Sequence, residues 1–504
     1  MPATGLDPAF TSLPLDDLAD AALARARELG AEHADLRVER IRTAYLALHD
    51  ARLESNHDSD ERGLAVRVVH DGTWGFAAGV ELTTSAAVRL VDEAVAVARA
   101  SKPVATERVE LAPEPSYDNG TWISTYDVDP FDVPVLDRIS LLEDWSAKLL
   151  SHKVVSHTDA TLRHVRENKY YADSAGTSTC QQRVRLQCQL TATWLDAESG
   201  RFETMRTLAP PVGRGWEWLS DGQYAWATEL AELPELLAEK AAAPSVQAGN
   251  YDVVIDPSNL WLTIHESIGH ATELDRALGY EANYAGTSFA TPDKLGSLQY
   301  GSPIMHVTGD RQAEHGLASV GWDDEGVAAQ TWDLIRDGVL VGYQLDRRIA
   351  AATGATRSNG CAFADSPMTV PIQRMANVSL QPGADDISTA DLISGIDDGI
   401  YIVGDKSWSI DMQRYNFQFT GQRFFRIKSG RLDGMLRDVA YQATTTDFWR
   451  SMDAVGGPQT YVLGGAFNCG KGQPGQTAPV SHGCPSARFR GVRILNTLAE
   501  GASA

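Results

Sequence analysis

The sequence predicts an α+β protein, with an N-terminal α/β domain on a mixed or antiparallel sheet and a C-terminal domain that is mainly β. In the first half, amphipathic helical segments alternate with long strand-like segments, whereas short strands and glycine turns dominate from about residue 300 onward. A linker-like stretch near 243–250 separates the two patterns, and 504 residues exceed what one core usually fills. We therefore expect two domains, residues 1–245 and 250–504.

The N-terminal half is expected to place helices around long strands. Apolar residues recur at steps of three and four over about 15–30, 84–100 and 136–150. The segment TELAELPELLAEKAAAPS is a further helix that Pro234 is expected to interrupt. Asp71-Gly72 indicates a hairpin turn, and alternation over 154–208 predicts further strands.

The C-terminal half begins with a short apolar strand and a turn at Asp256-Pro257. Ser258 or Asn259 can cap a helix that is expected to run to about 278. Beyond it, Asp337-Gly338 and Ser429-Gly430 predict hairpin turns between short strands. This half is therefore expected to be mainly β around one helix.

The composition excludes several classes of function. With 44 basic and 67 acidic residues the formal charge is −23, so direct nucleic-acid binding is not expected. The first residues lack the basic start and apolar core of a signal peptide, and no apolar run is long enough to span a membrane. Five scattered cysteines do not form a disulfide framework, so a cytoplasmic location is expected.

The segment LTIHESIGHATEL carries His265, Glu266 and His270 in an H-E-x-x-x-H pattern. Zinc proteases typically space these histidines four apart, about 40° around a helix, whereas five apart is about 140°. One π-type turn would return both side chains to one face, and such turns concentrate at functional sites. Gly269, which has no Cβ and tolerates unusual dihedrals, suits the deformation. The competing interpretation is a surface glutamate between two unrelated histidines.

A zinc hydrolase needs nitrogen or sulfur ligands, an open position for water and a nearby base. If His265 and His270 share one metal, Glu266 is the expected base for the metal-bound water. Glu273 could orient a histidine as a carboxylate behind the ligands, or be a solvated helix residue. Lys471 is expected to be a flexible surface lysine.

The residues alone leave the third metal ligand open. Nearby candidates are Glu273, Asp275 and Glu281, and distant candidates are Cys469, His482 and Cys484. Cys469 lies in a polar, glycine-rich loop, which makes it less suited to filling a core, but Cys469 and Cys484 remain close competitors.

Several blocks together resemble one known family. HESIGHATELD, DDEGVAAQTWDLIRDGVLVGY, IQRMANVSLQPG and FNCGKGQPGQTAPVSHGCP are similar to segments of the TldD/PmbA family of metalloproteases. The blocks extend over about 253–490, and the N-terminal half fits the family layout more loosely. IDMQRYNFQFTGQRFFRIKSGRL keeps only the outline of another family block. Cys484 stands where a non-cysteine residue is expected, and Thr272 replaces a usual apolar residue.

The resemblance implies a zinc-dependent peptidase for unfolded or linear peptides. It implies Zn²⁺ held by His265, His270 and Cys469, with Glu266 as base, and Cys484 as the alternative ligand. It also implies a homologous TldE-type partner that lacks the metal motif, although a self-dimer is open, and a possible role in leader-peptide removal from modified peptides. The N-terminal domain would provide the peptide cleft and partner contacts. Two other functions remain open: a non-catalytic binding or maturation partner with a structural zinc, and a zinc amidase or esterase for small acyl substrates.

Overall fold

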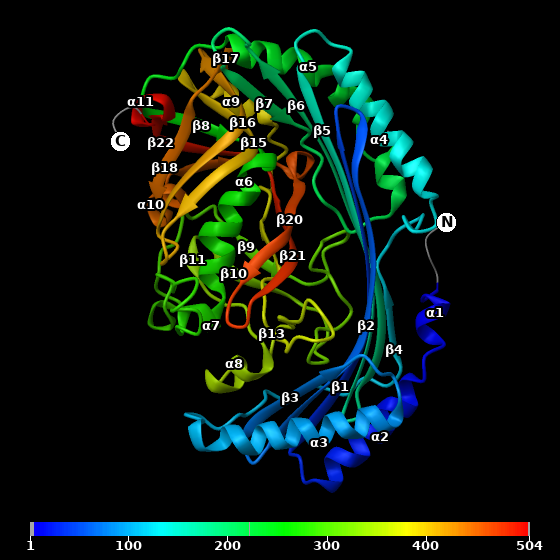
Figure 1. The fold of residues 1–504 in the computed structure, drawn as a ribbon. Coiled ribbons are helices and arrows are strands. Elements are labelled where there is room, and N and C mark those ends of the chain that lie inside the picture. Colours follow the sequence, from blue (N-terminus) through cyan, green and yellow to red (C-terminus); the bar gives the residue numbers. More distant parts are fainter. Residues whose placement is uncertain (1–4, 221, 502–504) are drawn as a thin grey trace.

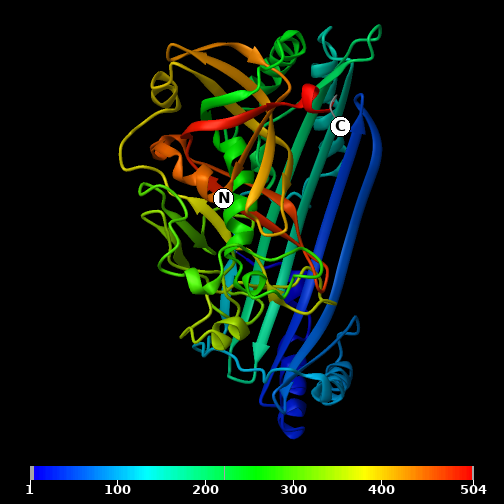
Figure 2. The ribbon, with the colours of Figure 1, turned by 90° about the vertical axis from the view of Figure 1, so that its left-hand side faces the viewer.

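The computed structural model describes residues 5–220 and 222–501. A long, curved sheet runs the length of the molecule on one side, and the C-terminal half lies against one of its faces (Figures 1 and 2). Helices and strands are present in both halves, so the predicted α+β class is confirmed. Among the described residues, no helix combines the length and apolarity that crossing a bilayer requires.

The N-terminal sheet contains seven strands in the order β3-β2-β1-β5-β6-β4, with β7 beside β6. Their bounds are β1 His33–His49, β2 Arg52–His70, β3 Thr73–Gly79, β4 Gly120–Ile123, β5 His157–Asp173, β6 Ser178–Leu195 and β7 Phe202–Arg206. Neighbouring strands are antiparallel except β4 and β6, which are parallel, so the sheet is mixed. The hairpin between β2 and β3 turns at Asp71-Gly72, as predicted, with positive φ at both residues.

Helices cover the two ends of this sheet (Figure 1). Their bounds are α1 Pro8–Thr11, α2 Leu15–Glu28, α3 Thr84–Ser101, α4 Val135–Leu150 and α5 Trp226–Ala242. Helices α2 and α3 share one apolar core with β1 and β2, and α4 and α5 share another with β5 and β6. The expected interruption at Pro234 is wrong, because α5 continues through this residue. Pro234 is buried among apolar side chains, and that packing offsets the missing backbone hydrogen bond.

The main C-terminal sheet closes on itself. Its order is β15-β8-β22-β18-β16-β17, and an additional pairing of β15 with β16 completes the ring, while β19 pairs with β22. The bounds are β8 Gly249–Ile255, β15 Asp398–Ile410, β16 Asn416–Lys428, β17 Arg431–Leu436, β18 Val439–Thr444, β19 Met452–Val455 and β22 Ala487–Asn496. The hairpin between β16 and β17 turns at Ser429-Gly430, as predicted.

Smaller strand groups and short helices surround this ring. The four-stranded sheet β11-β10-β9-β14 consists of β9 Val307–Asp310, β10 Thr331–Arg336, β11 Val339–Leu340 and β14 Asn377–Leu380. Two-stranded pairs are formed by β12 Ala362–Phe363 with β13 Ile372–Gln373, and by β20 Val462–Lys471 with β21 Gln476–Cys484. The helices are α6 Pro257–Ile264, α7 Leu274–Ala277, α8 Arg347–Ala352, α9 Thr389–Ser394, α10 Thr445–Arg450 and α11 Thr497–Gly501.

The two halves meet through buried charges. Lys169 on β5 donates to Asp324 at 2.7 Å, and Arg67 on β2 donates to Glu325 at 2.8 Å. The strands of the long sheet all precede residue 207, and those of the second half start at 249. The division into domains at 245 and 250 stays a prediction.

Candidate metal centre

The helix that carries the histidine motif is shorter than predicted. Asp256, rather than Ser258 or Asn259, caps α6, because its carboxylate accepts the Ser258 N–H at 3.0 Å. The regular helix ends at Ile264, and the expected continuous helix to about 278 is wrong. Glu273 adopts an extended backbone conformation that separates the motif from α7.

A single π turn occupies His265–Gly269, and the His270 N–H donates to the His265 carbonyl. The predicted deformation is confirmed, and the two imidazole rings lie edge to face with centroids 4.6 Å apart. Gly269 has an ordinary φ of −52°, so unusual dihedrals are not its reason. A Cβ there would lie 2.6 Å from the Met375 Sδ, so close packing requires the glycine.

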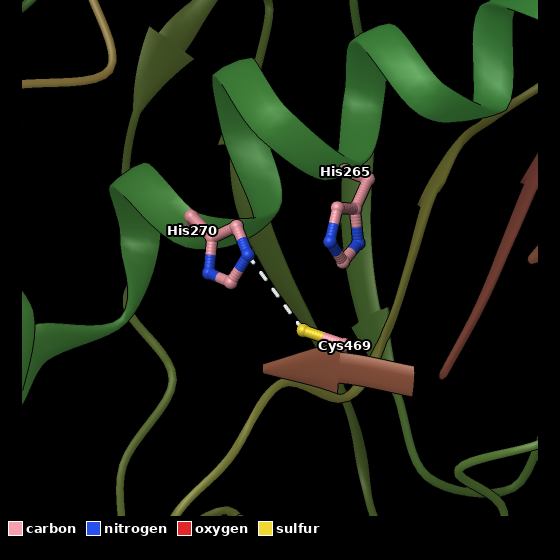
Figure 3. Close-up of side chains that lie close together, drawn as sticks. All are labelled: His265, His270 and Cys469. Atoms are coloured by element: carbon pink, nitrogen blue, oxygen red, sulfur yellow. Dashed lines mark hydrogen bonds between the residues drawn. The ribbon is translucent and has the colours of Figure 1, made fainter. Parts of the chain in front are cut away.

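Three donor side chains converge at this turn (Figure 3). The ligand atoms of His265, His270 and Cys469 all lie within 4.8 Å of one another, and all three residues are buried. The Cys469 Sγ is 3.6 Å from the His270 Nε2. Cys469 comes from β20, which runs beside α6. Two imidazoles and one thiol are a donor set that suits zinc.

Hydrogen bonds fix which ring nitrogen of His265 is free. The His482 Nδ1 is 2.8 Å from the Val378 carbonyl, which can only accept, so His482 carries its proton on Nδ1. Its Nε2 must then accept from the His265 Nδ1, at 2.7 Å. The His265 Nε2 is left with a lone pair for a metal.

Glu273 determines in the same way which ring nitrogen of His270 is free. Its Oε2 is 2.7 Å from the His270 Nδ1, so the His270 Nε2, which points to Cys469, is free to bind a metal. Lys471 in turn donates to the Glu273 Oε1 at 3.0 Å and to Asp275 at 2.9 Å. Burial alone would raise the pKa of Glu273, but the Lys471 charge and the His270 hydrogen bond hold that pKa well below its usual range. Glu273 therefore stays an acceptor behind His270.

The expectation of a flexible surface lysine at residue 471 is wrong. Lys471 is 3% exposed and is surrounded by carboxylates, which compensate its buried charge. Asp275 and Glu281, both considered as ligands from the sequence, instead pair with Lys471, and Glu281 also pairs with Arg276 at 3.1 Å.

The two competing cysteines have different surroundings. Burial tends to raise the pKa of the Cys469 thiol, but contact with the His270 imidazole and the nearby Arg374 charge lower that pKa below its ordinary value. Burial raises the pKa of Cys484 well above its ordinary value, and its thiol donates to the Pro257 carbonyl at 3.7 Å. A thiolate binds metal and a thiol does not, so Cys469 is the better suited of the two.

Glu266 lies next to the three donors and is ion-paired. Its Oε2 accepts from the Arg414 Nη1 at 2.5 Å, and the Glu266 side chain is 7% exposed. Burial tends to raise the pKa of Glu266, but its polar surroundings, which include the paired Arg414, lower that pKa below its ordinary value. Glu266 is thus an ionised proton acceptor in this site.

The three donor residues His265, His270 and Cys469 line a cleft of about 480 Å³ between the two halves. From the N-terminal half it is lined by Gln187, Gln189 and residues 206–211; from the C-terminal half by Trp261, His265, Glu266, His270, Asp405, Lys406, Trp408, Arg414, Val462 and residues 464–470. Strand β20 provides one wall, and in the described structure it pairs only with β21.

A second group of donors, His49, Asp50 and His157, lies at the surface where β1 turns into β2. The His157 Nδ1 and Asp50 Oδ2 are 2.9 Å apart, and His49 pairs with Asp159 at 2.9 Å. These exposed ion pairs account for the cluster without a metal.

Two contacts to motif side chains were not predicted from the sequence: His482, which was considered only as a metal ligand, hydrogen-bonds His265, and Arg414 pairs with Glu266. Neither lies at a fixed spacing from the motif, so only the fold brings them there. The cleft residues from β6 and residues 206–211 were likewise not identifiable.

Comparisons with known proteins agree with this architecture. The profile of the PmbA/TldA metallopeptidase C-terminal domain matches residues 248–496, and that of PmbA/TldA metallopeptidase domain 1 matches residues 34–98. A protein of Methanothermobacter thermautotrophicus named metalloprotease is 28% identical over 470 residues, covering 92% of this chain and 96% of that protein. A protein of Saccharolobus solfataricus named zinc metalloprotease TldD homolog is 23% identical over 479 residues, covering 93% and 98%.

Solved structures share the fold over nearly the whole chain. A putative modulator of a DNA gyrase from Thermotoga maritima superposes with a TM-score of 0.74 at 16% identity, covering 95% of this chain and 100% of that one. TldE from Thermococcus kodakarensis superposes with a TM-score of 0.69 at 17% identity, covering 94% and 99%.

Proposed function

The chain belongs to the TldD/PmbA metallopeptidase family, and we propose that it is a zinc-dependent peptidase that hydrolyses linear or unfolded peptides. One observation carries the proposal: His265, His270 and Cys469 converge beside an ionised Glu266 at the wall of an open cleft. A relative named as a zinc metalloprotease supports the choice of metal.

His265, His270 and Cys469 would hold the zinc ion. Both imidazoles have their Nδ1 engaged, by His482 and Glu273, which leaves each Nε2 as a ligand atom. When bound, zinc supplies Lewis acidity, which polarises a carbonyl and makes a water molecule more acidic.

Glu266 would act as the general base. Its carboxylate accepts a proton from the attacking water and then delivers this proton to the nitrogen of the leaving amine. The water oxygen first forms a new bond to the carbonyl carbon and the C–N bond then breaks, so the products are a carboxylic acid and an amine. The lowered pKa of Glu266 keeps its carboxylate unprotonated before the water attacks.

The cleft suits an extended peptide. Strand β20 lines the cleft and pairs only with β21 in the described structure, so a peptide could add to its other edge as a strand, with backbone hydrogen bonds that are independent of sequence. Trp408 is 54% exposed and lines the same cleft, where it could contact substrate side chains. We infer that substrates are recognised mainly through their backbone, and leader-peptide removal from modified peptides is one reaction of this kind.

Two alternatives fit the site less well. A structural zinc normally has four protein ligands, yet only three donors converge among the described residues. His482 and Cys484, the candidates for a fourth ligand, are engaged by His265 and by the Pro257 carbonyl. An amidase or esterase for small acyl substrates would need a small closed pocket, whereas this cleft is lined by both halves of the chain.

We also infer that the chain works in the cytoplasm with a homologous TldE-type subunit. The likeness to TldE from Thermococcus kodakarensis supports a partner of the same fold. All five cysteines are free, which fits a reducing compartment. Co-purification with a family member that lacks the His-Glu-His set would test the heterodimer, and a stable dimer of this chain alone would contradict it.

The function is tested by Glu266→Gln, which keeps the size of the side chain but removes the base. We expect full zinc content and a fall in the cleavage rate of an unfolded substrate such as casein by about 10²–10⁴-fold, the usual contribution of a general base. Glu235→Gln, which removes an exposed carboxylate on α5, is the matched control. Chelator-resistant cleavage, or an unchanged rate in Glu266→Gln, would contradict the proposed function.

A further inference from the structure

Arg414 contacts Glu266 from a turn whose shape is fixed by hydrogen bonds. The turn connects β15 and β16, and Arg414 is its left-handed residue, with φ of +63°. Asp411 accepts the N–H groups of Gln413 and Tyr415 at 3.1 and 2.8 Å, which fixes the shape of the turn. A left-handed backbone is unfavourable for arginine, and such strain persists where surrounding contacts impose it.

Neighbouring segments hold this turn on both sides. The Thr445 hydroxyl donates to the Arg414 carbonyl at 2.7 Å. On the other side, the Thr287 N–H donates to the Met412 carbonyl at 2.8 Å, and the Phe289 N–H to the Gln413 carbonyl at 3.0 Å. The Arg414 side chain therefore leaves a rigid support and has a defined position.

The guanidinium of Arg414 donates one hydrogen bond in the described structure, from its Nη1 to Glu266. Its Nε has no partner among the described residues but is buried, so the donors that a substrate in the cleft could reach are those of the Nη atoms. The side chain is 14% exposed and lines the cleft beside His265 and His270. A guanidinium has five N–H donors in a rigid plane, so it can serve Glu266 and a second oxygen together.

The other cations of the cleft are less suited to this position. Arg206 is engaged by Asp405, through the carboxylate and through the backbone carbonyl at 3.0 Å. Lys406 is exposed at the rim. Among the described residues that line the cleft, Arg414 is the arginine or lysine that hydrogen-bonds Glu266.

We propose that Arg414 is a second catalytic residue, which donates a hydrogen bond to the oxygen of the scissile carbonyl as that oxygen becomes negative. This inference rests on the proposed function. Water adds to the carbonyl carbon, and the electron pair of the C=O π bond moves to the oxygen that Arg414 contacts. The pair returns when the C–N bond breaks, and Glu266 carries the proton from water to the amine. Arg414 stays protonated throughout, and preorganised donors of this kind stabilise the transition state more than the substrate.

The test compares Arg414→Gln, Arg414→Lys and Arg414→Gly, with Arg426→Gln as the matched control. Arg426 lies on β16, as a carboxylate-paired arginine outside the cleft, 3.5 Å from Asp398. Glycine adopts φ of +63° without strain, so Arg414→Gly removes the side chain without disturbing the turn. Each variant is assayed for zinc content, for kcat and KM on a peptide amide, and for affinity to a phosphinic peptide that mimics the tetrahedral transition state.

We expect Arg414→Gln to lower kcat by about 10²–10³-fold with little change in KM or zinc content, as for the loss of one oxyanion donor. Affinity for the phosphinic peptide should fall by a similar factor, Arg414→Lys should recover part of both losses, and Arg426→Gln should match the wild type.

Two results would overturn the proposal. A fall in kcat with unchanged phosphinic-peptide affinity would mean that Arg414 only positions Glu266. A rise in KM confined to substrates with a free C-terminal carboxylate would mean that Arg414 anchors that carboxylate. If the wild type cleaves no peptide, the proposed function fails, and the phosphinic-peptide affinities of wild type and Arg414→Gln still decide whether Arg414 binds such an oxygen.

Discussion

His482 offers a sharp test of how the centre is prepared for metal. It is fully buried, donates to the Val378 carbonyl and accepts from the His265 Nδ1. His482→Leu removes both hydrogen bonds. His482→Gln can retain them, because the glutamine amide has one acceptor and two donors.

The expected loss in His482→Leu has two parts. The Val378 carbonyl and the His265 Nδ1–H both lose a partner, and each buried unsatisfied group costs about 1–3 kcal/mol. Loss of the group that orients a metal-bound histidine typically weakens metal affinity by about 10–100-fold, or about 1.4–2.8 kcal/mol. His265 is then free to rotate or to place its proton on Nε2, the atom that the metal needs.

The assay is competition for zinc against a chromophoric chelator. We expect His482→Leu to bind zinc about 10–100-fold more weakly than the wild type, and His482→Gln to stay within about threefold. Cys484→Ala is the matched control, since it also changes a buried β21 side chain, and the thiol of that residue donates to the Pro257 carbonyl rather than to His265. Wild-type zinc affinity in a folded His482→Leu would show that His482 does not orient His265 for the metal.

Three further predictions concern the same fold. Cys484→Ala should keep full zinc content and lower the free energy of unfolding by about 1 kcal/mol, because it removes a buried sulfur but no ligand; loss of zinc would contradict this. Gly269→Ala should destabilise by about 1–3 kcal/mol in chemical denaturation, since its Cβ would overlap Met375, and an unchanged midpoint would show that the π turn adapts. Burial and the adjacent Arg138 lower the pKa of His164 to about 3, so the unfolded chain takes up this proton first as the pH falls. The free energy of unfolding should therefore fall between about pH 6.5 and 3, by at most about 4–5 kcal/mol from this group. The His164→Gln variant should show a smaller dependence of this free energy on pH. An equal dependence in variant and wild type would show that His164 does not cause it.

The sequence allowed prediction of the local features whose physical cause is local. Asp71-Gly72 and Ser429-Gly430 define turns through their own backbone preferences, and the apolar spacing of 15–30 defines α2. The five-residue spacing of His265 and His270 predicted the π turn, because a regular helix would point the imidazoles apart. These features depend on a few neighbouring residues.

Other features depend on tertiary contacts and could not be derived from local pattern. The local pattern predicts that Pro234 breaks the helix, but α5 is continuous because Pro234 is buried among apolar side chains. The local pattern predicts a surface position for Lys471. In the structure it is surrounded by carboxylates that lie about two hundred positions earlier in the chain. Arg414 lies in a turn with no sequence signal for a left-handed arginine, and its contact with Glu266 appears only when β15 and β16 are placed beside α6.

X-ray absorption at the zinc edge of the purified protein would show whether two imidazoles and one thiolate hold a catalytic zinc. We expect one sulfur at about 2.3 Å and nitrogen or oxygen ligands at about 2.0–2.1 Å, with the sulfur signal lost in Cys469→Ala and kept in Cys484→Ala. A zinc site without sulfur, or with two sulfur ligands, would contradict this expectation.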